Sequence, residues 1–246
     1  MRDSIRLFRF AGIEVALHFT WFLAAAYFLT TRTHSYRAPV FALYEYIALF
    51  VIVLLHEFGH AFACRQVGGM ANYILLWPFG GVAFVRPPAR PGAQLWSIAA
   101  GPLVNVALVP VLLGVRLFAV QSGLAFQMPD TYRLISNISW INLALLIFNL
   151  LPIYPLDGGQ ILRSLLWFPL GRIRSLQIAS ITGLIGGAVV VLWAIRAGSI
   201  WIVVLAVFLL SQAIAGWRQA QALRLEEQEA TRVESQPSQP PRPPVL

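Results

Sequence analysis

Two histidines separated by one helical turn are the residues with the clearest chemical potential. His56 and His60 lie in the apolar stretch VIVLLHEFGHAFA, with Glu57 between them in sequence. Residues i and i+4 of an α-helix share one face, so the two imidazoles can take adjacent positions around a tetrahedral zinc ion. The carboxylate of Glu57 then lies beside the water that the metal activates, where it can act as general base. The pattern predicts zinc-dependent hydrolysis.

A catalytic zinc ion keeps one position open for water and takes a third ligand from elsewhere in the chain. The candidate is Asp157, in NLLPIYPLDGGQ, where Pro152 and Pro155 interrupt a helix and two glycines follow the carboxylate. Taken by itself, Asp157 would as readily cap the helix that follows. Beside the two histidines, metal ligation is the better interpretation. We expect His56, His60 and Asp157 to bind one zinc ion.

The composition predicts that this site lies in lipid. The 246 residues are 58% hydrophobic and only 11% charged, more apolar than a soluble domain of this length. The sequence therefore predicts an all-α polytopic membrane protein with about six transmembrane helices. Segments long and apolar enough to cross a bilayer lie near residues 13–31, 41–63, 93–120, 134–152, 176–195 and 199–217.

The basic residues indicate orientation rather than a nucleic-acid partner. The net charge of +8 comes from arginines scattered between the spans, without an RNA-binding motif. An amino terminus in the cytoplasm puts most of these arginines on the cytoplasmic side, so both termini are predicted there, in a multi-pass protein of the cell membrane. The second and fourth spans then run in the same direction. This brings the ends that carry His56, His60 and Asp157 to the same side.

The segment 68–92 is too interrupted for a helix and too apolar for an ordinary loop. It is predicted to be re-entrant and to line a cavity, because irregular backbone is tolerated at membrane depth only where its polar groups are satisfied. Two extended pieces, residues 72–76 and 81–85, indicate a hairpin that turns at residues 78–80. From residue 218 onward the composition is polar, first helix-forming and then Pro-rich, which predicts a cytoplasmic helical extension and a disordered tail over 218–246.

The sequence resembles the site-2 protease family of intramembrane metalloproteases. The resemblance rests on HEFGH at 56–60 and the NxxPxxPLDGG pattern at 149–159, and extends to FGGVA at 79–83, GPLVN at 101–105 and IEVALHFTW at 13–21. It implies a transmembrane metalloprotease domain over residues 1–217, with one zinc ion held by His56, His60 and Asp157 and with Glu57 as the catalytic base. It also implies cleavage of single-pass membrane proteins within or beside the bilayer. The chain resembles a minimal form without a PDZ or CBS domain, so a regulatory membrane partner is one expected source of control.

Two further elements are candidates for substrate contacts. The amide of Asn105, in GPLVN, can hold the substrate backbone or the oxygen on which charge develops, although it can equally pack between helices. An edge strand containing Gly81, Val82 and Ala83 can pair with an unwound substrate by β-augmentation.

Several other polar residues are expected to have structural roles. Asn142 and Asn149 are expected to stabilise helix packing, and His18 is expected to be an interfacial structural histidine. Cys64 continues the face of the two histidines, but a three-ligand zinc leaves its fourth position to water. Cys64 is also the only cysteine in the chain, which excludes an intramolecular disulfide.

Two other functions fit the same constellation. A non-proteolytic zinc-binding scaffold or transporter would use the three ligands for binding alone, and would have no need of a base at Glu57. A membrane-anchored peptidase would act on soluble cytoplasmic peptides, although the membrane depth of the motif disfavours it. Glu57 is the residue that separates the protease from the binding protein.

Overall fold

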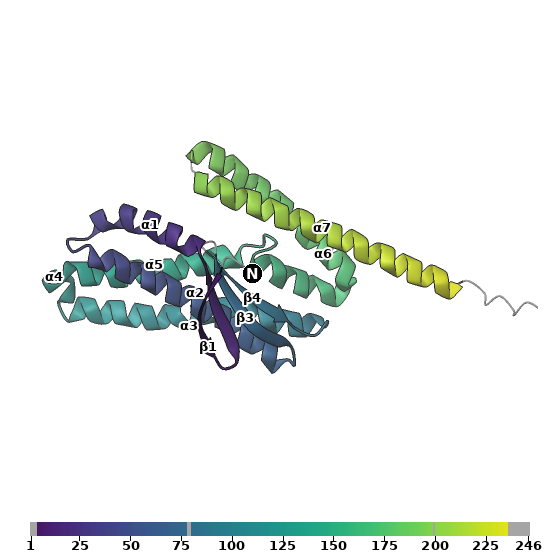
Figure 1. Ribbon diagram of the computed structural model, residues 1–246, viewed down its shortest axis with the longest axis horizontal. Coiled ribbons are helices and arrows are strands. Elements are labelled where there is room, and N and C mark those ends of the chain that lie inside the picture. The colour runs from purple at the N-terminus through teal and green to yellow at the C-terminus, as the bar shows by residue number, and fades with distance from the viewer. Residues whose placement is uncertain (1–3, 78–79, 199, 236–246) are drawn as a thin grey trace, which may run out of the picture.

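The computed structural model describes residues 4–77, 80–198 and 200–235. Within these ranges five helices are long and apolar enough to cross a membrane, which makes the chain a mostly helical, multi-pass membrane protein (Figure 1). They are α2 (Val40–Gln66), α3 (Pro91–Gln121), α5 (Pro129–Leu150), α6 (Asp157–Ala197) and α7 (Ile200–Ser235). The described residues also form three shorter elements: α1 (Thr20–Arg32) and η1 (Thr33–Ser35), which precede α2, and α4 (Leu124–Gln127), which lies between α3 and α5.

A four-stranded sheet accompanies the helices, so the fold is not all-α as predicted. Its order is β1 (Ser4–Phe10), β2 (Ile13–His18), β3 (Met70–Trp77) and β4 (Gly80–Arg86). The pairs β1–β2 and β3–β4 are antiparallel, whereas β2 and β3 run parallel. The antiparallel β3–β4 pair corresponds to the two extended pieces predicted from the sequence, and residues 78–79 of the expected turn lie outside the described residues.

The first predicted span, residues 13–31, is wrong as a single transmembrane helix. Residues 13–18 form β2, and the helix that follows, α1, has only 13 residues. At 1.5 Å per residue such a helix is about 20 Å long, short of the roughly 30 Å of a hydrocarbon core. A short apolar run cannot be assigned to a helix or a buried strand from hydrophobicity alone. Ile13 and Val15 are β-branched and alternate with Glu14, and this pattern suits the strand.

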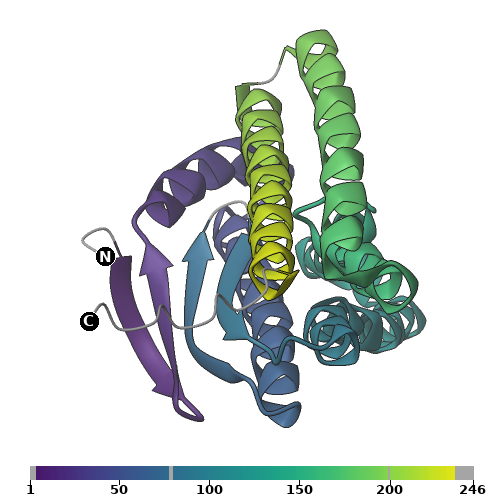
Figure 2. The same ribbon diagram turned by 90° about the vertical axis from the view of Figure 1, so that its right-hand side faces the viewer.

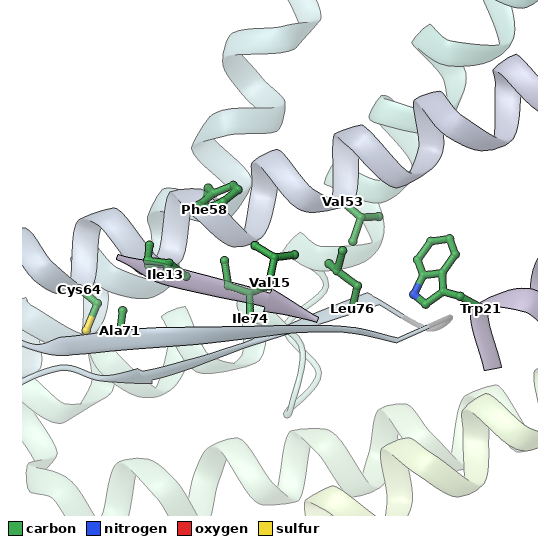
Figure 3. Packing of buried hydrophobic residues seen from close by; sticks show 10 residues of the cluster. Ile13, Val15, Trp21, Val53, Phe58, Cys64, Ala71, Ile74 and Leu76 are labelled. Carbon is green, nitrogen blue, oxygen red and sulfur yellow. The ribbon is translucent and has the colours of Figure 1, made fainter. Parts of the chain in front are cut away.

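The hydrophobic core lies between the sheet and α2 (Figure 3). Ile13 and Val15 of β2 and Ile74 and Leu76 of β3 are fully buried and point to one face of the sheet, as residues two apart on a strand must. Phe58 of α2 packs against them. Because these contacts are close, they fix the rotation of α2 about its axis and therefore the direction of its polar face.

The last two helices form a pair of their own beside the bundle (Figures 1 and 2). Helix α6 bends at Gly171, whose φ of 78° lies in the left-handed region that favours glycine, two residues after Pro169. The segment before the bend begins with Asp157, and the segment after it packs along α7. Helix α7 continues unbroken through the predicted domain boundary at residues 217–218, and residues 236–246 lie outside the described part of the chain.

A polar clasp, formed by Arg32, Tyr36, Glu45 and Asn137, joins α1, the η1–α2 connection, α2 and α5. The fully buried Glu45 accepts hydrogen bonds from the Tyr36 hydroxyl at 2.5 Å and the Asn137 amide at 3.0 Å, and it pairs with Arg32 at 2.8 Å. Burial and the hydrogen bond to Glu45 raise the pKa of Tyr36 above the usual tyrosine range. Tyr36 therefore keeps its proton and remains the donor.

Candidate metal centre and active site

Three ligand atoms from two helices converge at one point. His56 and His60 lie one turn apart on α2, and Asp157 is the first residue of α6. The two Nε2 atoms are 3.1 Å apart, and Asp157 Oδ2 lies 3.0 Å from His56 Nε2 and 3.4 Å from His60 Nε2. Both histidines are buried and Asp157 is partly buried. Among the described residues, these three form the one group of histidine, cysteine, aspartate and glutamate side chains that offers the geometry of a metal site.

The hydrogen bonds behind the histidines show that this group fits a metal ion. His60 Nδ1 donates to the backbone carbonyl of Ser97 at 2.9 Å, and His56 Nδ1 donates to Asn105 Oδ1 at 2.6 Å. A neutral imidazole that donates from Nδ1 presents only a lone pair at Nε2. Both Nε2 atoms face the buried Asp157 Oδ2, at 3.0 Å from His56 and 3.4 Å from His60. Two imidazole nitrogens and a carboxylate oxygen that converge in this way are a ligand set that suits a zinc ion.

Glycines allow the surrounding backbone to approach the site. A Cβ atom at Gly101 of α3 would lie 2.3 Å from His60 Nε2 and 2.8 Å from His56 Nε2. A Cβ atom at Gly158 would lie 2.3 Å from the carbonyl oxygen of Leu150, at the end of α5. No real Cβ atom tolerates such distances, so α3 can cover the imidazoles, and the turn before α6 can close, only with glycine at these positions.

The strand β4 positions Glu57. The backbone N–H of Ala83 donates to Glu57 Oε2 at 2.9 Å. A Cβ atom at Gly81, two residues earlier on the same strand, would lie 2.1 Å from Glu57 Cγ. The carboxylate is buried and lines the same cavity as the three ligand atoms. Since β4 is an edge strand of the sheet, the backbone beside Glu57 is free of a strand partner on that side.

The site opens into a cavity of about 430 Å³. Its walls are mostly apolar, with a few amide side chains from different helices, a composition typical of ligand-binding cavities. Beside the residues already described, the lining includes Val53, Trp77, Val85, Ile98, Leu145, Phe148, Asn149, Pro155, Leu156, Gln160, Phe208 and Gln212. Trp77 of β3 and Phe208 of α7 pack edge to face with ring centroids 5.6 Å apart, so α7 meets the sheet at the cavity wall.

The structure does not bring Asn105 to the cavity. This residue was a candidate for a substrate contact or for packing between helices, and it is fully buried behind His56 and does not line the cavity. Its oxygen accepts from His56 and its nitrogen donates to Asn142 Oδ1 at 2.8 Å, so both polar atoms are occupied. Asn142 is thus part of the support of the site, whereas Asn149 lines the cavity.

Two other predicted structural residues lie apart from the three ligand atoms. His18, at the end of β2, contacts the Thr20 hydroxyl through Nδ1 at 2.7 Å and packs near Trp77. Cys64 is buried and directs its thiol to the backbone oxygen of Met70 at 3.5 Å.

Sequence reasoning missed the carbonyl of Ser97 and the aromatic pair of Trp77 and Phe208. A signal for Ser97 was present, because Ser97, Gly101 and Asn105 follow one another at four-residue spacing and so share one face of α3. No comparable signal identifies Phe208. It lies in an apolar run whose residues look alike until α7 is placed against the sheet.

Comparisons with known proteins agree with this geometry. Peptidase family M50 matches the chain over residues 44–138 and 119–193. A zinc metalloprotease of Methanocaldococcus jannaschii is 34% identical over 210 residues, covering 85% of this chain and 59% of the relative. A putative zinc metalloprotease of Synechocystis is 31% identical over 241 residues, covering 90% and 62%. The chain therefore spans about three fifths of the length of these relatives. The solved structure of a site-2 protease from M. jannaschii superposes with a TM-score of 0.64 at 30% identity, covering 87% of this chain and 95% of that one.

Proposed function

Because the chain belongs to peptidase family M50, the family of the site-2 proteases, we propose that it is a zinc-dependent intramembrane endopeptidase. Its substrates are single-pass membrane proteins, which it cleaves within or near the bilayer. One observation supports this proposal above the others. The ligand atoms of His56, His60 and Asp157 lie within 4.8 Å of one another, and a buried carboxylate, Glu57, shares their cavity.

In this proposal His56, His60 and Asp157 hold one zinc ion, and Glu57 is the catalytic base. Bound zinc supplies a Lewis acid that polarises the scissile carbonyl and activates water. Glu57 accepts a proton from that water and returns it to the leaving amine. The Ala83 N–H holds Oε2 of Glu57, which leaves Oε1 available for the proton. The apolar walls of the cavity limit the water around the reacting groups.

A transmembrane substrate must unwind before its carbonyls can be reached, and β4 offers replacement hydrogen bonds. The strand segment Gly81–Val82–Ala83 lies beside Glu57 on the free edge of the sheet. The Ala83 N–H faces away from β3, so the edge-facing positions in the two-residue period are Gly81, Ala83 and Val85. Because the Ala83 N–H holds Glu57, the substrate pairs through the N–H groups of Gly81 and Val85. An extended substrate segment that pairs with this edge lies across the cavity mouth. A substrate rich in weak helix formers at the cut site unwinds at the lowest cost.

The same proposal covers the location of the protein in the membrane and the control of its activity. The distribution of arginines favours a cell-membrane protein with the site towards the cytoplasmic side. Five crossings put the two termini on opposite sides of the membrane, so cytoplasmic positions for both termini require a sixth crossing. Membrane lipid surrounds the five long helices. Cleavage is controlled by a regulatory membrane partner, or by a requirement that another protease trims the substrate first.

The proposal is tested with the purified protein in detergent and a panel of tagged single-span substrates. Wild type, Glu57→Gln and wild type with a zinc chelator are compared, and zinc content is measured in each. We expect cleavage in wild type alone, with zinc retained in Glu57→Gln. Glu14→Gln is the matched control, since Glu14 lies on β2, does not line the cavity and pairs with the exposed Arg6.

The same experiment separates the protease from a non-proteolytic zinc-binding scaffold or transporter. Stoichiometric zinc without cleavage of any substrate would favour the scaffold or transporter. Cleavage that survives in Glu57→Gln would refute the role given to that carboxylate.

A further inference from the structure

Two buried amides connect His56 to the backbone of α3. Asn142 Nδ2 donates to the backbone carbonyl of Asn105 at 3.0 Å, and Asn105 Nδ2 donates back to Asn142 Oδ1 at 2.8 Å. Asn105 Oδ1 then accepts from His56 Nδ1 at 2.6 Å. Both asparagines have an exposed fraction of 0%. The three hydrogen bonds therefore form one continuous chain without contact with solvent.

The backbone carbonyl fixes the direction of every bond in this chain. A carbonyl oxygen can only accept, so Asn142 must turn its NH₂ group towards it and its own oxygen towards Asn105. Asn105 must then present its NH₂ group to Asn142, which leaves only its oxygen for His56. His56 must in turn carry its proton on Nδ1, and its Nε2 is left as a free lone pair. The metal-binding tautomer of His56 is thus fixed by a backbone carbonyl, through the side chains of Asn142 and Asn105.

We propose that Asn142 is a positioning residue that fixes the metal-binding tautomer of His56. This inference rests on the proposed function, in which His56 Nε2 is a zinc ligand. Without the Asn142 oxygen, the Asn105 amide is free to rotate by 180° and to offer its NH₂ group to His56 Nδ1. His56 then carries its proton on Nε2, and that nitrogen is lost as a ligand until the proton moves.

His60 provides an internal comparison. Its Nδ1 donates directly to the carbonyl of Ser97, an acceptor that cannot rotate into a donor. The tautomer of His60 therefore needs no supporting side chain. A change at Asn142 is expected to alter the tautomer of His56 and to leave the tautomer of His60 unchanged. A general loosening of the helix packing would affect both histidines.

The experiment compares Asn142→Leu, which removes both amide functions, with Asn142→Asp, whose protonated carboxyl keeps both the acceptor for Asn105 Nδ2 and a donor for the Asn105 carbonyl. Ser139→Ala is the matched control, because the Ser139 hydroxyl lies one turn away on α5 and bonds only to the Ile135 carbonyl of its own helix. Zinc affinity is measured by competition with a chelator, together with thermal unfolding of the metal-free protein. The chain has only four histidines, so selective ¹⁵N-histidine labelling and NMR of the metal-free protein report each tautomer directly.

We expect zinc binding about 10- to 100-fold weaker in Asn142→Leu, as is typical when the support of a histidine ligand is lost. We also expect wild-type affinity in Asn142→Asp and Ser139→Ala, and a mixed tautomer at His56 alone in the leucine variant. If the leucine variant does not fold, the same measurements are made on Asn142→Ala. Unchanged affinity and an unchanged His56 tautomer in a folded Asn142→Leu or Asn142→Ala protein would overturn the inference. The tautomer measurement needs neither zinc nor cleavage, so failure of the proposed protease function would be seen separately, in wild type.

Discussion

Two glycines adjoin the site, Gly81 beside Glu57 and Gly101 beside the two histidines, and alanine at each should damage a different part of the mechanism. A Cβ atom at Gly81 would lie 2.1 Å from Glu57 Cγ, whereas contact between carbon atoms is optimal at about 3.5–4.0 Å. The Glu57 side chain must therefore shift by about 1.4 Å or more. The side chain can give way only towards the cavity that it lines, and this shift carries its carboxylate away from the Ala83 N–H that holds it.

A misplacement of about 1 Å can cost about 100-fold in rate. We therefore expect Gly81→Ala to lower kcat by about 100-fold, equivalent to about 2.7 kcal/mol of activation free energy. The zinc content should remain at the wild-type level, since the clash involves the base and none of the three ligands. Gly101→Ala should instead disturb the binding of zinc. Its Cβ atom meets both Nε2 atoms, so zinc affinity should fall by at least about tenfold.

The assay measures zinc affinity and single-turnover cleavage at saturating zinc for both variants. Gly114→Ala is the control, because Gly114 lies on α3 and its added Cβ atom would meet nothing within 4 Å. The control should match wild type in both measurements. Equal loss of zinc in the two variants, or a kcat for Gly81→Ala within about threefold of wild type, would refute the separation of base and ligands drawn from the geometry.

Three further predictions concern the clasp, the metal and the strand edge. Tyr36→Phe removes a hydrogen bond to the buried Glu45 and should lower the free energy of unfolding by about 1.5–3 kcal/mol, with the exposed Tyr44→Phe as control in the same thermal denaturation. Because the pKa of Tyr36 is raised in the folded protein, this contribution should be complete below the usual tyrosine pKa of about 10 and be lost above it, and a loss near neutral pH would contradict the assignment. Removal of zinc should lower the melting temperature of wild type and leave that of His56→Ala unchanged, since a ligand present at about 1,000 times its Kd stabilises by about 4 kcal/mol. Val85→Pro should slow substrate cleavage while Val85→Ala does not, and equal rates for the two would count against strand pairing at β4.

The metal ligands were predictable from the sequence because their signals are local or topological. His56 and His60 follow the helical repeat, and Asp157 stands at a helix interruption that membrane topology brings to the same side. The structure brings their ligand atoms within 4.8 Å of one another. Their roles as ligands stay a prediction until zinc is measured.

Other features depend on contacts that residue types do not specify. Residues 13–18 form a strand because β3, more than fifty residues later, pairs with them, and the hydrophobicity of the run is the same for helix and strand. Asn105 was a candidate both for a substrate contact and for packing between helices, because its amide suits either role. Its partner in the structure, His56, depends on the rotation of α3, which close packing decides. The contribution of Ser97 is a backbone carbonyl, a group that every residue possesses.

One face of α3 explains how a membrane helix prepares a metal site on its neighbour. Ser97, Gly101 and Asn105 lie four residues apart, and they supply a carbonyl acceptor, a close approach and an amide acceptor to the two histidines of α2. In an apolar surrounding an unpaired Nδ1–H would cost free energy, so these two acceptors favour the neutral tautomers that leave both Nε2 atoms as lone pairs. These three residues can act on the histidines only if α3 keeps this position relative to α2. A shift of α3 by one residue would move Gly101 away from the imidazoles and place Pro102 or Ala100 against them, so the helix that contributes no predicted ligand determines whether the predicted ligands can bind.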